Sequence, residues 1–231
     1  MRSRLSPGND GDVEEGYSEP DLSLYVIADC AIARRPVPEI VEAALAGGAT
    51  AVQLRWKTGT DRQILAVGEA LRLITRRAGV PLIVNDRVDL ALALEGDGVH
   101  LGPDDLPVRL ARKLLGGGAI IGYSAGEAGE AAVAEAEGAD YLGVGPFRVT
   151  TTKEDAGAPL GPAGLARVAR AVRIPVIAIG GLGADTVAAA VAAGAAGVAV
   201  ASAVMTAEAP EAACRELLQL VRAARTRERR P

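Results

Sequence analysis

The chain has 231 residues, of which 49% are hydrophobic and 23% are charged, a balance typical of a globular protein with a full core. Its 25 Lys and Arg residues stand against 29 Asp and Glu residues, so the net charge is -4 and no basic field favours nucleic acid as a partner. No apolar run approaches the length of a membrane span, and Cys30 and Cys214 match no metal-binding or redox spacing. We therefore expect a cytoplasmic protein with reduced thiols and no membrane segment.

The two ends of the chain differ in composition from the rest. Residues 1–21 are rich in Gly, Pro, Ser and acidic residues and lack apolar periodicity, which predicts a disordered extension. Residues 223–231 are mostly basic, and we interpret them as a helix end that frays into solvent. One folded domain is expected between them, over residues 22–222.

Short apolar runs recur through this domain. Each run is too short for a helix and is continuously apolar, as expected for a strand that is covered on both faces. The runs occupy residues 24–28, 51–54, 81–84, 98–101, 119–122, 141–144, 175–179 and 197–200.

Helical patterns separate the apolar runs. Residues 37–45 carry apolar side chains at helical spacing before the pair Gly47 and Gly48, and residues 64–74 keep the same periodicity. Asp185 is placed to cap a later helix. Eight such strand–helix units predict an α/β fold, a (β/α)8 TIM barrel, with an open doubly wound sheet as the alternative.

A barrel of this kind carries its chemistry on the loops at the carboxyl ends of its strands. Gln53, Arg55 and Lys57 alternate at the end of the second run, so their side chains point to one side. An Arg fork beside a Lys point charge suits a pyrophosphate, and Lys153 adds a third cation to the rim. The alternative is an ion pair of these cations with Asp86 or another carboxylate of the barrel.

Asp86 and Asp105 follow neighbouring strands. Two carboxylates beside bound phosphates predict a Mg2+ site, in which water and phosphate oxygens complete the metal's ligands. The alternative is structural: Asp86 would cap the next helix, and Asp105 would stabilise a turn.

A second anion site is expected where Gly180 and Gly181 follow the seventh run and Ser202 follows the eighth, the usual phosphate site of these barrels. Two anion sites predict two phosphorylated substrates or one bisphosphate. His100 lies inside a strand and fits a packed core residue as well as a catalytic one, so we leave it out of the catalytic set.

Together these motifs resemble those of the thiamine-phosphate synthase family, from about residue 22 to 220. The matching motifs are Gln53-x-Arg55-x-Lys57, Asn85-Asp86, Asp105, Ser124, Thr150-x-Thr152-Lys153, Gly180-Gly181 and Ala201-Ser202. The resemblance implies a Mg2+-dependent transferase of thiamine biosynthesis. Such an enzyme joins 4-amino-2-methyl-5-hydroxymethylpyrimidine diphosphate to a thiazole phosphate, with or without a carboxylate, and the pyrophosphate leaves first in a dissociative step.

The resemblance also implies roles for individual residues. Arg55, Lys57 and Lys153 would be catalytic, and Asp86 and Asp105 would hold Mg2+. The pyrimidine diphosphate would be bound by Gln53, Arg55, Lys57, Asn85, Ser124 and Lys153. The thiazole phosphate would be bound by Thr150, Thr152, Gly181, Ala201 and Ser202. The chain departs from the family pattern at Trp56, Pro103, Gly126, Arg148 and Val149.

Two alternatives to a synthase share the same barrel. A thiazole tautomerase often lacks the metal carboxylates and the first lysine, and a non-catalytic paralogue would bind a thiamine precursor without turning it over. Retention of Lys57, Asp86 and Asp105 favours the synthase. The sequence leaves open whether the barrel is a monomer or a homo-oligomer.

Overall fold

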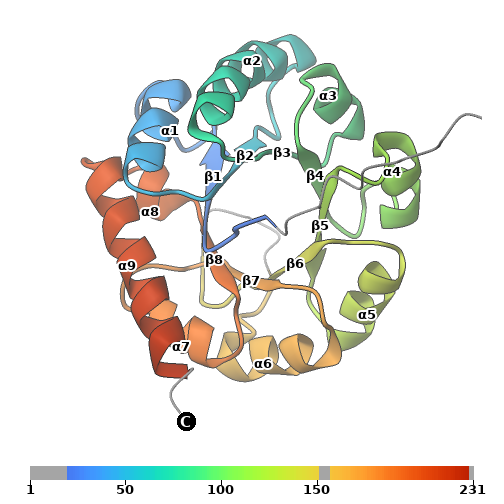
Figure 1. Ribbon diagram of the computed structural model, residues 1–231, viewed down its shortest axis with the longest axis vertical. Coiled ribbons are helices and arrows are strands. Elements are labelled where there is room, and N and C mark those ends of the chain that lie inside the picture. The colour runs from blue at the N-terminus through green and yellow to red at the C-terminus, as the bar shows by residue number, and fades with distance from the viewer. Residues whose placement is uncertain (1–19, 151–156, 229–231) are drawn as a thin grey trace, which may run out of the picture.

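The computed structural model describes residues 20–150 and 157–228, and within them eight parallel strands close into a barrel ringed by helices (Figure 1). The strands follow one another in chain order, and β1 pairs with both β2 and β8. This is the (β/α)8 TIM barrel that the sequence predicts. The strands are β1 (Leu24–Asp29), β2 (Ala51–Arg55), β3 (Leu82–Asn85), β4 (Gly98–Leu101), β5 (Ile120–Ala125), β6 (Tyr141–Val144), β7 (Val176–Ile179) and β8 (Gly197–Val200).

The helices cover the outside of the barrel. They are α1 (Val37–Ala46), α2 (Asp61–Ala78), α3 (Val88–Ala93), α4 (Val108–Leu115), α5 (Ala128–Ala136), α6 (Gly161–Ala171), α7 (Val187–Ala192), α8 (Ser202–Met205) and α9 (Pro210–Glu228). One predicted cap is wrong, because α7 begins after Thr186 and the carboxylate of Asp185 instead pairs with Arg148.

Two apolar layers form the core. Leu24 and Val26 of β1 face outward to the helices, whereas Tyr25 and Ile27 face into the barrel, as the two-residue period of a strand requires. The inner layer includes the fully buried Ile83, and it fills the barrel so that no open pore runs through the strands. Burial of one such aliphatic side chain contributes roughly 1.5–3 kcal/mol.

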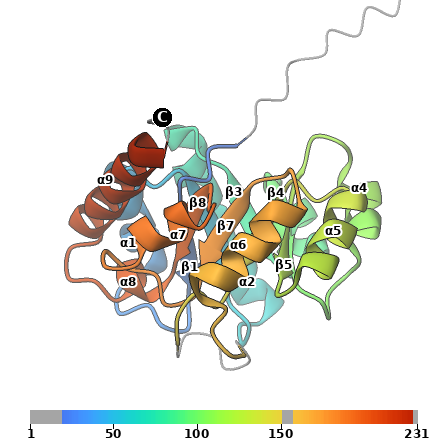
Figure 2. The ribbon, with the colours of Figure 1, turned by 90° about the horizontal axis from the view of Figure 1, so that it is seen from below.

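The carboxyl-terminal end of α9 and the start of β1 lie together at the amino-terminal end of the barrel, away from the loops that follow the strands (Figure 2). Arg225 donates a hydrogen bond from Nη1 to Ser23 Oγ at 2.7 Å, and Ala224 is buried. These contacts carry α9 past the domain boundary expected at residue 222. Residues 1–19, most of the predicted amino-terminal segment, and 229–231, the last three residues of the predicted carboxyl-terminal segment, lie outside the described residues.

Among the described helices, none has the combination of length and apolar character that crossing a lipid bilayer requires.

Candidate active site

The carboxyl ends of the strands surround a cavity of about 540 Å3. It collects every predicted site residue that the structure describes. These residues are Gln53, Arg55, Lys57, Asn85, Asp86, Asp105, Ser124, Thr150, Gly181, Ala201 and Ser202. Thr152 and Lys153 lie outside the described residues. A wider groove of about 1000 Å3 at the opposite end of the barrel is lined by none of these residues.

Both cations at the end of β2, Arg55 on the strand and Lys57 just after it, have carboxylate partners. Arg55 forms an ion pair with Asp29, which is 1% exposed at the end of β1, and Lys57 Nζ lies 3.2 Å from Asp86 Oδ2. The register of β1 and β2 sets Asp29 beside Arg55. The ion pairing considered as the alternative is therefore present. It does not use up the five donors of a guanidinium or the three of an ammonium group, so an anion can still bind.

Asp29 was missed by the sequence analysis, which ended the first apolar run at Ala28. The only available signal was an acidic residue directly after an apolar run, at the same strand end as the other candidates.

Asp86 and Asp105 face each other across the loops after β3 and β4, close enough to share a hydrogen bond. Partial burial raises the pKa of Asp105, and the neighbouring Asp86 carboxylate raises it further. Asp105 Oδ2 also accepts a hydrogen bond from the Gly102 amide at 2.6 Å, so the turn interpretation holds alongside the pairing with Asp86.

Two carboxylates in contact fit a small divalent cation, which replaces their repulsion with attraction. Mg2+ is commonly held by one or two carboxylates, with water and phosphate oxygens as its other ligands. Among the described residues, no group of three or more His, Cys, Asp or Glu side chains could hold a metal ion. A cation at Asp86 and Asp105 would therefore depend on oxygens from water or a bound phosphate.

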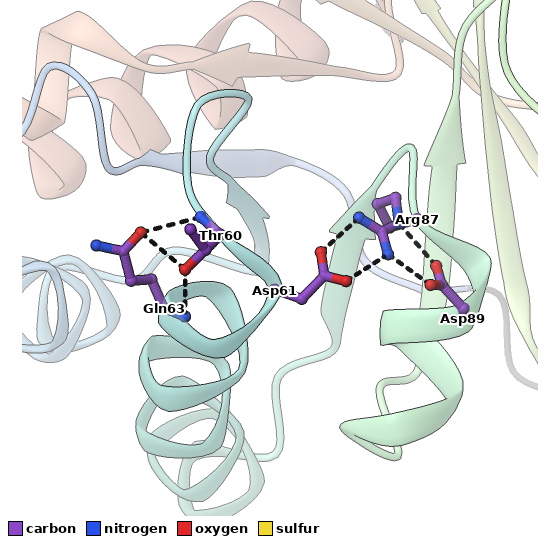
Figure 3. Close-up of polar contacts among 5 residues, drawn as sticks. All are labelled: Thr60, Asp61, Gln63, Arg87 and Asp89. Carbon is purple, nitrogen blue, oxygen red and sulfur yellow. Dashed lines mark hydrogen bonds and ion pairs between the residues drawn. The ribbon is translucent and has the colours of Figure 1, made fainter.

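The loops that carry Lys57 and Asp86 are tied together by Arg87 (Figure 3). Its guanidinium binds Asp61 at 2.8 and 3.2 Å and Asp89 at 2.6 and 2.8 Å, in the first turns of α2 and α3. These hydrogen bonds to Arg87 lower the pKa values of Asp61 and Asp89. The clamp fixes the spacing of the two helix starts.

Each of these loops has one further local constraint. Thr60 and Gln63 form a capping box in which the backbone N–H of Thr60 donates to Gln63 Oε1 at 2.9 Å, which fixes the start of α2 (Figure 3). Asp86 has a φ of 63°, a conformation rare outside glycine. A strained backbone beside the cavity indicates that the position of the Asp86 carboxylate is determined by the structure around it.

The opposite wall of the cavity is built from backbone. Gly180 and Gly181 have φ values of 86° and 66°. A Cβ on Gly181 would lie 2.9 Å from the carbonyl oxygen of Arg148, so only glycine fits against the loop after β6. Ala201 and Ser202 approach the same wall where α8 begins.

His100 lies on the cavity although the sequence analysis left it out. Its ring projects inward from β4, with Nε2 2.9 Å from Ser124 Oγ. A lone histidine in an apolar run does not reveal which face of the strand it occupies, and the register with β5 decides this.

The departures from the family pattern divide into two groups. Trp56 packs against the outer core, Arg148 pairs with Asp185 near the surface, and Val149 is exposed, so none of these three lines the cavity. Pro103 and Gly126 do line it.

Comparison with known proteins identifies the family of the chain. The family model described as "Thiamine monophosphate synthase" matches residues 24–204. The chain belongs to the thiamine monophosphate synthase family. A solved structure, thiamine phosphate pyrophosphorylase from Pyrococcus furiosus, superimposes with a TM-score of 0.82 at 41% identity, over 89% of this chain and 98% of that one.

Curated relatives match a shorter part of the chain. Thiamine-phosphate synthase of Chloroflexus aurantiacus is 55% identical over 142 residues, which is 61% of this chain and 65% of that protein. The Moorella thermoacetica enzyme of the same name is 52% identical over 143 residues, or 62% of this chain and 68% of that protein. The chain thus matches about two thirds of the length of these relatives.

Proposed function

We propose that this chain is a thiamine-phosphate synthase, a transferase that joins a pyrimidine diphosphate to a thiazole phosphate and releases pyrophosphate. The observation that supports this best is the arrangement of the cavity. The cations Arg55 and Lys57 meet the Asp86–Asp105 pair on one side, and the backbone that follows β7 and β8, with Gly180 and Gly181, forms the opposite wall.

The first side of the cavity suits the diphosphate of the pyrimidine substrate. Arg55 and Lys57 would bind its oxygens, and the partners Asp29 and Asp86 hold both cations in place before the substrate arrives. Lys153 is proposed as a third cation on the leaving group. Preorganised positive charge stabilises a group that gains negative charge in the transition state.

Asp86 and Asp105 are the proposed ligands of Mg2+. When bound there, the cation supplies positive charge that stabilises the departing pyrophosphate. The bond between the pyrimidine methylene carbon and the diphosphate oxygen breaks, and a bond from the thiazole nitrogen to that carbon forms. The apolar side chains Ile27 and Ile179 at the cavity help to keep water from this carbon.

The second side suits the thiazole phosphate. Backbone N–H groups near Gly181 and Ser202 would bind its phosphate, with Thr150 and Thr152 contributing hydroxyls. Asn85 and Ser124, from β3 and β5, would bind the pyrimidine together with Gln53.

The cytoplasm is the proposed location, since both cysteines of the described chain are free.

The test is a product assay with both phosphorylated precursors, with and without Mg2+, in which thiamine phosphate is oxidised to fluorescent thiochrome. Product that forms only with Mg2+ is the expected result. Folded protein that makes no product and binds the thiazole phosphate alone would instead indicate a tautomerase or a non-catalytic paralogue.

A further inference from the structure

Beneath the cavity, five polar side chains form one continuous hydrogen-bonded chain across the inside of the barrel. Gln53 Nε2 donates to the Tyr25 hydroxyl at 2.9 Å, and the Tyr25 and Tyr141 hydroxyls are 2.9 Å apart. Tyr141 Oη lies 3.0 Å from His100 Nδ1, and His100 Nε2 lies 2.9 Å from Ser124 Oγ. The five residues come from five different strands, β2, β1, β6, β4 and β5.

The two ends of this series of hydrogen bonds reach the cavity, and its middle does not. Gln53, His100 and Ser124 line the cavity, whereas Tyr25 and Tyr141 lie below it and are 1% and 0% exposed. A ligand at Gln53 and a ligand group at Ser124 are therefore connected through protein that water does not reach.

The barrel interior makes room for these rings. A Cβ at Gly122 would lie 2.1 Å from Tyr141 Cζ and 2.5 Å from His100 Nδ1, and one at Gly143 would lie 3.0 Å from His100 Cε1. The two rings stack with centroids 5.5 Å apart. Glycine at these inward positions gives up apolar packing, so the polar chain occupies space that aliphatic side chains would otherwise fill.

The chemistry of the groups determines which atom is the donor and which is the acceptor in every one of these hydrogen bonds. The Gln53 amide N–H can only donate, so the Tyr25 oxygen accepts and its own proton goes to Tyr141. Tyr141 then donates to Nδ1 of His100, which places the imidazole proton on Nε2, facing Ser124 Oγ. The hydroxyl proton of Ser124 is thereby left to point into the cavity.

Reversal of a single link would leave a buried hydroxyl proton without an acceptor, which is unfavourable in a site that excludes water. All four hydrogen bonds must therefore point the same way. With Nε2 of Gln53 bonded to Tyr25, its carbonyl oxygen is left as the acceptor for a ligand, and the Ser124 hydroxyl is left as the donor.

We propose that His100 is a positioning residue: a neutral imidazole, protonated at Nε2, that holds the Ser124 hydroxyl as a donor and couples it to the Gln53 amide. The ligand that fits is a heteroaromatic ring with an amino group as donor and a ring nitrogen as acceptor. This choice of ligand rests on the proposed function, where the substrate is an aminopyrimidine; the proton arrangement does not.

The first test uses the protein without any substrate. His100 is the only histidine of the chain, so NMR of protein labelled with ¹⁵N at histidine gives a single imidazole to observe. We expect a protonated Nε2 and an unprotonated Nδ1. A proton on Nδ1, a doubly protonated ring or averaged shifts would overturn the proposal.

Variants then test the coupling. Tyr25→Phe, which removes a hydroxyl that does not touch His100, should produce a mixture of the two tautomers. Tyr123→Phe is the matched control, because Tyr123 lies next to Ser124 on β5 but packs against the outer core. A Tyr25→Phe spectrum identical to that of the unmodified protein would refute the coupling.

Kinetics separate this proposal from the proposed function. Tyr141→Phe should raise KM for the pyrimidine diphosphate about tenfold, with KM for the thiazole phosphate unchanged. The role of His100 would be contradicted if both KM values changed equally or if neither changed. If the unmodified protein makes no product but shows the expected tautomer, the proposed function fails and the proton arrangement stands.

Discussion

Substitution of Asp105 by Asn separates a metal-binding role for this carboxylate from a structural one. The pKa of Asp105 is raised by its partial burial and by Asp86, so at neutral pH its charge opposes folding. Asn keeps an oxygen that can accept the 2.6 Å hydrogen bond from Gly102 while it removes the charge. We therefore expect Asp105→Asn to make the metal-free protein more stable and to abolish turnover.

The size of the gain is limited by solvent. The Asp86–Asp105 pair is only partly buried, so water screens the repulsion, and a gain on the order of 0.5–1 kcal/mol is expected. The size of the gain depends on pH. The pKa of Asp105 is higher in the folded protein than in the unfolded chain, so the carboxyl destabilises the fold increasingly as pH rises from the unfolded pKa to the folded pKa. The advantage of Asn should therefore grow over this pH window, and it should vanish in acid, where the carboxyl is protonated.

Urea unfolding followed by circular dichroism measures this difference, first without metal and then with Mg2+ and pyrophosphate. Ligand at about 100 times its Kd stabilises a protein by about 2.7 kcal/mol, so saturation should reverse the order and make the unmodified protein the more stable one. If Asp105→Asn were less stable without metal, the hydrogen bond to Gly102 would outweigh the repulsion and our reasoning would fail.

Three further predictions concern other parts of the site. Lys153→Ala should abolish product formation without changing the unfolding midpoint, and retained activity in the thiochrome assay would remove Lys153 from the catalytic set. Gly181→Ala should destabilise the protein by about 1–3 kcal/mol in urea unfolding, because its φ is 66°, and should raise KM for the thiazole phosphate. Arg87→Met should reduce stability only above about pH 4. The pKa values of Asp61 and Asp89 are lowered by Arg87, so the stability from these ion pairs is lost as pH falls through those pKa values and the carboxylates become protonated. Equal losses at neutral and acid pH in urea unfolding would contradict this.

The fold could be predicted because its signal is repeated. Short apolar runs alternate with helical periodicity eight times, and a closed parallel barrel is the arrangement that covers both faces of every strand. The first and last residues of individual helices were predicted less well than their existence. α2 begins at Asp61 and ends at Ala78, beyond the predicted 64–74, because its capping box and final turn are polar.

The place of the site followed from the fold, whereas its pairings did not. Polar residues after the strands meet at one end of any such barrel, so Gln53, Lys57 and Asp105 could be grouped from sequence alone. The partner of Arg55 depends on strand register, which puts Asp29 beside it, and no pattern in the sequence specifies that register. The inward orientation of His100 was hidden for the same reason.

The charge of the cavity itself indicates how the diphosphate of the proposed substrate would bind. Within the described residues, the lining has two cations, Arg55 and Lys57, and each is already paired with a carboxylate. The carboxylates of the lining are Asp29, Asp86, Asp104, Asp105 and Glu130. A pyrophosphate that entered alone would meet an excess of negative charge, and Lys153, the proposed third cation, would offset this by only one positive charge.

A divalent cation at Asp86 and Asp105 would reverse this balance, so metal and pyrophosphate should each increase the affinity of the other, and linkage requires the two effects to be equal. Calorimetric titration of pyrophosphate with and without Mg2+ measures this coupling, and Asp105→Asn should reduce it. The substitution removes one carboxylate that repels pyrophosphate and also one proposed ligand of the metal. It should therefore strengthen binding of pyrophosphate alone while it weakens binding with Mg2+, and two changes in the same direction would refute the assignment of Asp105 to the metal.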